Sequence, residues 1–294
     1  MATTRVNDID VYFDDLGAAG DPAVLLVSGL GAHCLVYDDE FCDLLVRTGH
    51  RVVRFDNRDV GLSTHLDGAS ADALAAVLAA ASGEPVPAAY TLSDMAADAV
   101  GLLDALDLEA VHVAGASMGG MIAQLIAIEH PERVLSLTSI MSTTGEPDVG
   151  TPDPEVLGAL MSIMTPQTTR QARIDNGVEL ARIIGTPEVF DEPRVRERTA
   201  WFVDRAYDPD GTARQLIAIT ASGSRADGLA ELDLPTVVLH GDRDRLVGIS
   251  GGRRTAELVP GAEFRTLEGM AHDLPPAYWD RMVAGVLDSA AARR

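Results

Sequence analysis

Short apolar runs recur along the first half of the chain, each separated from the next by a polar turn or an amphipathic stretch. A short continuous apolar run is typical of a strand covered on both faces of a sheet. We interpret four such runs as strands, at 23–27, 51–55, 111–114 and 134–141. The stretches 40–48 and 92–106 have the apolar spacing of helices. The short apolar run Ile9–Phe13 is followed by the polar stretch Asp14–Gly17. This pattern indicates a hairpin at the sheet edge.

This alternation of strands and helices predicts an α/β fold with a mostly parallel, doubly wound sheet. The pattern changes between 145 and 230, where we find helical patches separated by Gly and Pro and no convincing strand. Strands and helices then alternate again at 236–240, 252–259, 262–267 and 278–291. We therefore expect a core domain formed by 1–144 and 231–294, with 145–230 inserted as a helical cap after the strand Val134–Met141. Methionine and aromatic side chains of such a cap would form an adaptable apolar wall for a pocket.

Composition and charge narrow the class of protein. The chain has 294 residues, of which 47% are hydrophobic, enough for a substantial core, and a net charge of −22. That charge argues against nucleic acids and anionic membrane surfaces as partners, because both require clustered basic residues. No segment reaches the roughly 18 apolar residues of a membrane span, and the N-terminus has no apolar signal region. Cys34 and Cys42 are interpreted as free thiols in a reducing compartment, so we expect a cytoplasmic protein of undetermined oligomeric state.

The candidate chemistry lies where the strand at 111–114 breaks into a Gly-x-Ser-x-Gly pentapeptide, Gly115–Gly119. A serine in a tight strand-to-helix turn holds its hydroxyl clear of the backbone, and the two glycines lack the Cβ atoms that would collide there. The helix that follows directs its free N–H groups toward any negative charge that develops beside Ser117. The pentapeptide alone also fits a glycine-rich turn without catalytic function, so a catalytic role for Ser117 requires partner residues elsewhere in the chain.

A serine nucleophile needs a base within hydrogen-bond reach and a third group that orients the base. Parallel sheets place such groups after the carboxyl ends of their strands. Asp244 follows the predicted strand 236–240, and His272 follows 262–267. Asp242 is an alternative acid. His33 is close enough to the early turn to line a pocket, but we expect it at the surface. No cluster has zinc-ligand spacing and no glycine-rich nucleotide loop occurs, so we expect neither a metal nor a cofactor.

Six segments in the expected order resemble the α/β-hydrolase-fold serine hydrolases along nearly the whole chain. They are Val27–Gly31, Asp56–Ser63, Gly115–Gly119, His130–Val134, His240–Asp244 and Glu268–His272. Within that superfamily the chain resembles lidded bacterial carboxylesterases of the aclacinomycin methylesterase type. The order Ser117, Asp244, His272 is the order of this fold.

The resemblance implies a role for each matching residue. Ser117 would be the nucleophile, His272 the general base and later acid, and Asp244 the orienting carboxylate. The backbone N–H groups of Leu30 and Met118 would form the oxyanion hole. Many relatives carry His-Gly where this chain has Ser28-Gly29, so the details of that turn stay open.

The resulting hypothesis is a cofactor-free hydrolysis of a small apolar carboxylic ester through an acyl-enzyme intermediate. The same triad serves thioesterases, lactonases, carbon–carbon bond hydrolases and cofactor-free haloperoxidases or perhydrolases, and the sequence does not separate them. A ligand-binding module without turnover is an alternative of another class.

Overall fold

The computed structural model describes residues 2–292 and contains one eight-stranded sheet. The strands are β1 (Ala2–Val6), β2 (Ile9–Leu16), β3 (Ala23–Val27), β4 (Arg51–Phe55), β5 (Val111–Ala116), β6 (Val134–Ile140), β7 (Thr236–Gly241) and β8 (Glu263–Leu267). They lie in the order β1-β2-β4-β3-β5-β6-β7-β8. Strands β3 to β8 pair in parallel, whereas β1 and β2 pair antiparallel at one edge. The predicted mostly parallel α/β sheet is therefore confirmed.

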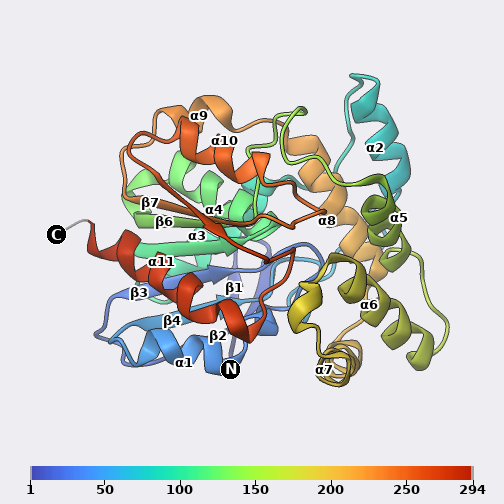
Figure 1. Ribbon diagram of the computed structural model, residues 1–294, viewed down its shortest axis with the longest axis horizontal. Helices are drawn as coiled ribbons and strands as arrows, with labels where there is room; N and C mark the ends of the chain where they lie inside the picture. The colour runs from blue at the N-terminus through green and yellow to red at the C-terminus, as the bar shows by residue number, and fades with distance from the viewer. Residues whose placement is uncertain (1, 293–294) are drawn as a thin grey trace.

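Helices cover both faces of this sheet, as Figure 1 shows. The helices that pack against the sheet are α1 (Asp39–Val46), α3 (Leu92–Ala105), α4 (Met118–Glu129), α10 (Ser250–Leu258) and α11 (Trp279–Ala291), whereas α2 (Ala73–Ala81) packs against α8 (Pro209–Ser222). Short 3-10 helices span Cys34–Val36, Pro131–Arg133, Pro187–Val189 and Pro276–Tyr278. Buried side chains of α3 and α4 form one apolar cluster with the sheet, and those of α1 and α11 form a second on the opposite face. The central strands are buried on both sides, which explains their continuous apolar runs.

The N-terminal edge of the sheet differs from the prediction in its bounds. The hairpin joins β1 to β2 through Asn7 and Asp8, and β2 continues through Asp14 and Asp15, which the sequence pattern places beyond the strand. Asp14 is buried because Arg54 on the neighbouring strand donates to its Oδ2 from Nε at 3.0 Å and from Nη2 at 2.9 Å. A paired carboxylate is tolerated inside a strand, although its residue type alone indicates a turn.

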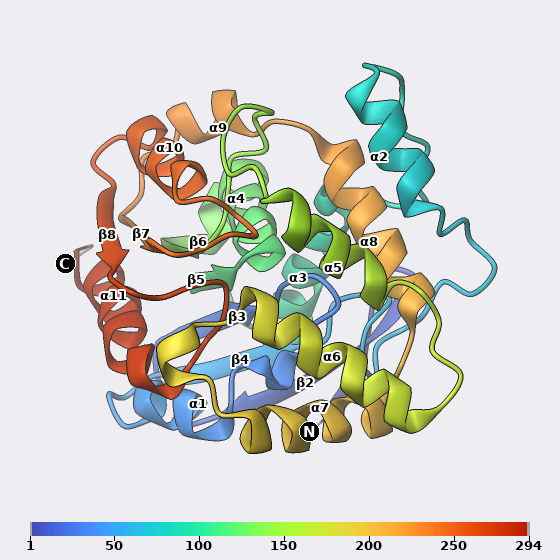
Figure 2. The same ribbon diagram turned by 45° about the vertical axis from the view of Figure 1, so that its right-hand side comes forward.

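Between β6 and β7 the chain forms only helices. They are α5 (Pro154–Ile163), α6 (Arg170–Ile184), α7 (Glu192–Arg205), α8 (Pro209–Ser222) and α9 (Ala226–Ala230). Figure 2 brings α5, α6 and α7 to the front, beside the end of the sheet where β5 gives way to α4. Leu229 of α9 packs instead into the apolar cluster of α3 and α4. Within residues 2–292, no helix is both long enough and apolar enough to cross a membrane.

Candidate active site

Ser117 occupies a strained turn between β5 and α4. Its φ of 58° lies in the left-handed region that non-glycine residues rarely adopt. A Cβ on Gly115 would lie 2.1 Å from the carbonyl oxygen of Gly119, and one on Gly119 would lie 2.0 Å from that of Val27. Glycine is therefore required at both positions by close backbone approach. Strain that the surroundings maintain in this way is a frequent property of functional sites.

The structure brings the side chains of Ser117, His272 and Asp244 together. His272 Nε2 lies 2.9 Å from Ser117 Oγ, and His272 Nδ1 lies 2.7 Å from Asp244 Oδ2. Because a carboxylate only accepts hydrogen bonds, Nδ1 carries the proton and Nε2 is free to accept one from the serine hydroxyl. The three residues come from the loops after β5, β7 and β8, as expected for the carboxyl edge of a parallel sheet.

Asp244 is held as an ionised acceptor. Its Oδ1 accepts the N–H groups of Leu246 and Val247 at 2.9 and 2.8 Å, which leaves Oδ2 for His272. Burial alone would raise the pKa of Asp244, but the imidazoles of His272 and His240 outweigh burial and hold this pKa well below its usual range. The carboxylate therefore stays charged at neutral pH and stabilises an imidazolium at His272.

The alternative acid, Asp242, has a different place in the structure. Its exposed carboxylate accepts the N–H of Gly269 at 2.7 Å and so fixes the start of the loop that carries His272. His240 is fully buried at the end of β7, where its Nε2 donates to the carbonyl of Val247 at 2.7 Å. Of the two carboxylates, only Asp244 contacts the imidazole of His272.

The turn after β3 lies directly against Ser117. A Cβ on Gly29 would lie 3.3 Å from Ser117 Cβ. The N–H of Gly31 donates to Gln215 Oε1 at 2.8 Å, and that of Ala32 donates to the carbonyl of Gly29 at 3.2 Å. Among the hydrogen bonds of residues 2–292, the amides of Leu30 and Met118 have no acceptor. Both amides are thus available to a ligand beside Ser117.

Gln215 is a contributor to this turn that the sequence did not reveal. It lies on α8, is fully buried, and also donates from Nε2 to the carbonyl of Arg58 at 2.7 Å. A lone glutamine in a helical stretch carries no sequence signal for such a role, because its two partners are distant along the chain.

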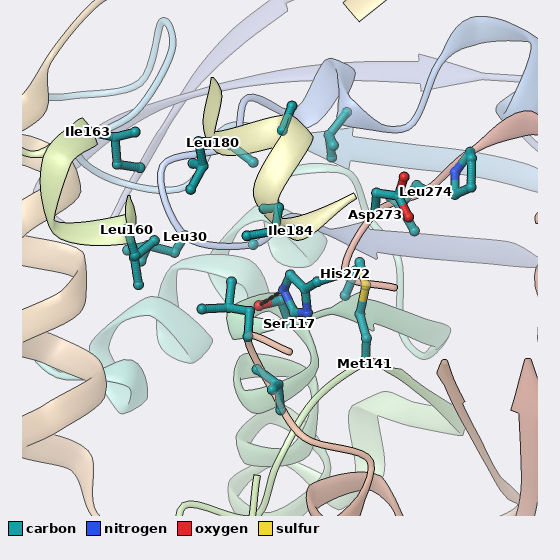
Figure 3. Close-up of a pocket in the computed structure, with 18 of the residues that line it drawn as sticks. Leu30, Ser117, Met141, Leu160, Ile163, Leu180, Ile184, His272, Asp273 and Leu274 are labelled. Atoms are coloured by element: carbon teal, nitrogen blue, oxygen red, sulfur yellow. Dashed lines mark hydrogen bonds between the residues drawn. The ribbon is translucent and has the colours of Figure 1, made fainter. Parts of the chain in front are cut away.

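A cavity of about 520 Å³ opens above Ser117 and His272. Figure 3 shows apolar side chains of α5 and α6 facing these two residues, with Met141 from the end of β6 beside them. The labelled apolar residues of the wall are Leu30, Met141, Leu160, Ile163, Leu180, Ile184 and Leu274. Its volume lies within the range of small-molecule sites, roughly 300–1,000 Å³. The arrangement therefore places a serine hydroxyl and an imidazole together at the base of an apolar cavity.

His33 corrects one expectation from the sequence. It is buried, not at the surface, and lines a second cavity of about 270 Å³ that shares Leu30 with the first. Its Nδ1 lies 3.1 Å from Arg205 Nη1, and its ring centroid lies 4.9 Å from that of Phe202. Burial lowers the pKa of His33 to about 4, so the ring is neutral and accepts from the arginine. Both contacts come from α7, which the pattern around His33 does not reveal.

Asp59, His65 and Asp208 place their ligand atoms within 4.8 Å of one another, close enough to hold a metal ion. These atoms are already engaged by protein groups. Arg214 donates to both oxygens of Asp59 at 2.9 and 2.8 Å, and His65 Nδ1 lies 2.6 Å from Asp208 Oδ2. The cluster is a partly buried network of ion pairs that ties the start of α8 to the loop after β4.

These features agree with the comparison to known protein families. Residues 22–275 match the family model of the alpha/beta hydrolase fold, and the chain belongs to this family.

Among known relatives, the chain is similar to the rhodomycin D methylesterase DauP of Streptomyces sp. (strain C5), with 28% identity over 95% of this chain and 94% of the relative. It is also similar to the 2-hydroxy-6-oxononadienedioate/2-hydroxy-6-oxononatrienedioate hydrolase 2 of Pseudomonas putida, with 27% identity over 90% of this chain and 86% of the relative. The crystal structure of the enol-lactonase from Burkholderia xenovorans LB400 superimposes with a TM-score of 0.76 and 21% identity, over 99% of this chain and 100% of that one. The resemblance to methylesterases expected from the sequence is thereby confirmed, and the structural likeness supports the fold.

Proposed function

We propose that this hydrolase cleaves carboxylic esters of apolar small molecules through a covalent acyl-enzyme intermediate. The observation that carries the proposal is the chain of short contacts from Ser117 to His272 to Asp244 at the base of an apolar cavity. The likeness to a methylesterase favours an ester over the other substrates of serine triads.

In the first half of the reaction, Ser117 Oγ attacks the ester carbonyl carbon while His272 Nε2 takes the hydroxyl proton. The carbonyl oxygen becomes an oxyanion, which the amides of Leu30 and Met118 stabilise. Removal of one such donor typically costs about 3–4 kcal/mol of transition-state stabilisation. The C–O bond to the alcohol then breaks, and His272 returns its proton to the departing alkoxide oxygen.

In the second half, His272 takes a proton from water, which attacks the acyl carbon. The bond to Ser117 Oγ breaks, the serine regains its proton from His272, and the carboxylic acid leaves. Asp244 keeps the imidazole in the required tautomer throughout. Residues 145–230 act as a cap, since α5 and α6 supply much of the cavity wall and so select the acyl or alcohol group.

The test is a panel of p-nitrophenyl esters of increasing acyl length and aryl methyl esters, compared with acyl thioesters, lactones, carbon–carbon bond substrates and a peroxide–bromide assay. We expect the esters to have the highest kcat/KM and the S117A variant to lose about 10⁴-fold or more in kcat. Preference for another substrate class would replace ester hydrolysis by that activity. Tight ligand binding without Ser117-dependent turnover would contradict catalysis and favour a binding module.

A further inference from the structure

The loop that carries His272 is held from two sides. On the side of the core, Asp242 accepts the N–H of Gly269 at 2.7 Å, and the N–H of Arg243 donates to the carbonyl of Met270 at 3.0 Å. On the side of the helical insertion, the carbonyl of Ile184 accepts the backbone N–H of His272 at 2.8 Å. The backbone of His272 is thus anchored to the end of α6, not to the core.

Thr186 makes three further hydrogen bonds to the same loop. Its N–H donates to Asp273 Oδ2 at 3.0 Å, and its hydroxyl donates to Asp273 Oδ1 at 2.6 Å. The hydroxyl oxygen also accepts the N–H of Ala271 at 3.0 Å. Thr186 is fully buried, and with Ile184 it engages three consecutive residues, 271–273.

Gly185, between Ile184 and Thr186, allows the backbone to pass close to Asp273. A Cβ on Gly185 would lie 2.5 Å from the carbonyl oxygen of Ala181 and 3.2 Å from Asp273 Oδ2. The N–H of Gly185 donates to that carbonyl at 2.9 Å as α6 ends. Glycine therefore lets the chain leave the helix and pass directly beside the Asp273 carboxylate.

Asp273 has no arginine partner among these contacts. Burial raises the pKa of Asp273, and the two hydrogen bonds from Thr186 act against that rise. Figure 3 shows this carboxylate beside the cavity near His272. Desolvation of a carboxylate is unfavourable unless hydrogen bonds compensate, so the pair depends on Thr186 staying in place.

We propose that Thr186 and Asp273 form a latch, a pair of hydrogen-bonded side chains that positions His272. Residues 184–186 of the insertion are then positioning residues of the active site. The inference rests on the proposed function. Hydrogen bonds to Asp244 and Ser117 orient the imidazole ring, whereas the latch determines where the backbone beneath it lies. A displacement of about 1 Å at a reacting group can lower the rate by about 10²-fold.

The latch also connects the cap to the chemistry. If α6 moves away from the cavity, the carbonyl of Ile184 and the side chain of Thr186 move with it, and the loop at 271–273 loses four hydrogen bonds. His272 is then correctly placed for catalysis only while Ile184 and Thr186 contact the loop at 271–273.

The T186V variant tests the latch because it keeps the size of the side chain and removes the hydroxyl. Thr186 does not line the cavity, so we expect kcat to fall about 10- to 100-fold while KM changes little. T186S retains the hydroxyl and should restore most of kcat. The matched control is T255V, which removes another fully buried hydroxyl, donated to the Gly251 carbonyl at 2.9 Å on α10. It should lower the melting temperature without lowering kcat.

A second measurement, the rate at which a fluorophosphonate labels Ser117, should fall in parallel with kcat. A T186V kcat equal to that of T255V would overturn the latch, as would failure of T186S to rescue. If T186V does not fold, D273N replaces it, because its amide replaces one acceptor oxygen of the latch with a donor. Asp273 also lines the cavity, so only the kcat of D273N, and not its KM, is compared with that of T255V. Absence of Ser117-dependent turnover in the unmodified protein would overturn the proposed function instead, and the two failures are thus distinguishable.

Discussion

The sheet and the helical insertion meet at the cavity, but they are stabilised by different contacts. The strands that lead to Ser117 and Asp244 are buried along their whole length, as is most of α4. By contrast, every residue of α7, all of which the structure describes, keeps at least part of its surface exposed. Exposed ion pairs join α7 to α6, including Arg170 with Asp204 and Arg196 with Asp175.

The core and the insertion therefore have different tasks: the core holds the side chains of the site in place, and the insertion shapes the cavity above them. Apolar burial in the core fixes the positions of Ser117 and Asp244, since each buried apolar side chain contributes roughly 1.5–3 kcal/mol. Exposed ion pairs contribute little and leave the insertion free to adjust. A few buried polar contacts tie the insertion to the core, among them Arg205 with Asp56 and Thr186 with Asp273. Within the insertion, local opening is therefore expected to cost least at α7, whereas α8 is largely buried and more firmly packed.

The largest effect is expected for a change within the core that leaves packing untouched. D244N preserves the shape of the side chain but removes the charge that selects the tautomer of His272, and kcat should fall by about 10⁴-fold. D242N is the matched control, because its carboxylate contacts Gly269 and not the imidazole. Steady-state kinetics on the preferred ester measures both variants. A larger loss in D242N than in D244N would assign the acid to Asp242.

Substitutions in the core should lower the free energy of unfolding more than substitutions in the exposed ion pairs of the insertion. Leu239 is fully buried in β7, so L239A should reduce the free energy of unfolding by about 2–5 kcal/mol. D204N removes the exposed partner of Arg170, whose Nε lies 2.6 Å from Asp204 Oδ1, and should leave that free energy almost unchanged. Urea denaturation followed by circular dichroism compares the two. Equal losses would show that the insertion is as tightly coupled to the fold as the sheet.

The two regions also differ in how far the sequence predicts them. Apolar runs and the Gly-x-Ser-x-Gly turn are local signals, so the strands and the position of Ser117 on its turn follow from neighbouring residues. The order of Asp244 and His272 along the chain, with the rule that ligands bind at the carboxyl ends of parallel strands, predicts their proximity to Ser117. Their catalytic roles stay a proposal until the variants are measured.

Contacts between distant segments have no such local signal. Asp14 resembles a turn residue until Arg54 is placed beside it, 40 residues away. His33 looks exposed until Arg205 covers it from α7, 172 residues away. Thr186 and Asp273 are 87 residues apart, and neither lies in a recognisable motif. The parts of the site that depend on the insertion are thus the parts that required the structure.

His65 and His33 lie where the insertion meets the core. They should make the stability of this boundary depend on pH, and this effect is expected to be smaller than those of the preceding variants. Burial lowers the pKa of His65, but the hydrogen bonds to Asp208 and to the Gly61 carbonyl outweigh burial, and the net pKa is raised above its ordinary value of 6.5. Its contribution to stability is therefore fully present below pH 6.5 and is lost as the pH rises through the raised pKa.

His33 has the opposite sign. Its pKa of about 4 in the folded protein lies below the ordinary 6.5, so the unfolded chain binds a proton more readily. The stability contributed by neutral His33 is present above pH 6.5 and is lost as the pH falls from 6.5 toward 4. Melting temperatures of H33Q and H65Q, each measured relative to the unmodified protein between pH 4 and 8, separate the two. We expect the deficit of H65Q to be largest at low pH and that of H33Q to be largest at high pH. Parallel curves for the two variants would contradict these assignments and place both imidazoles in similar surroundings.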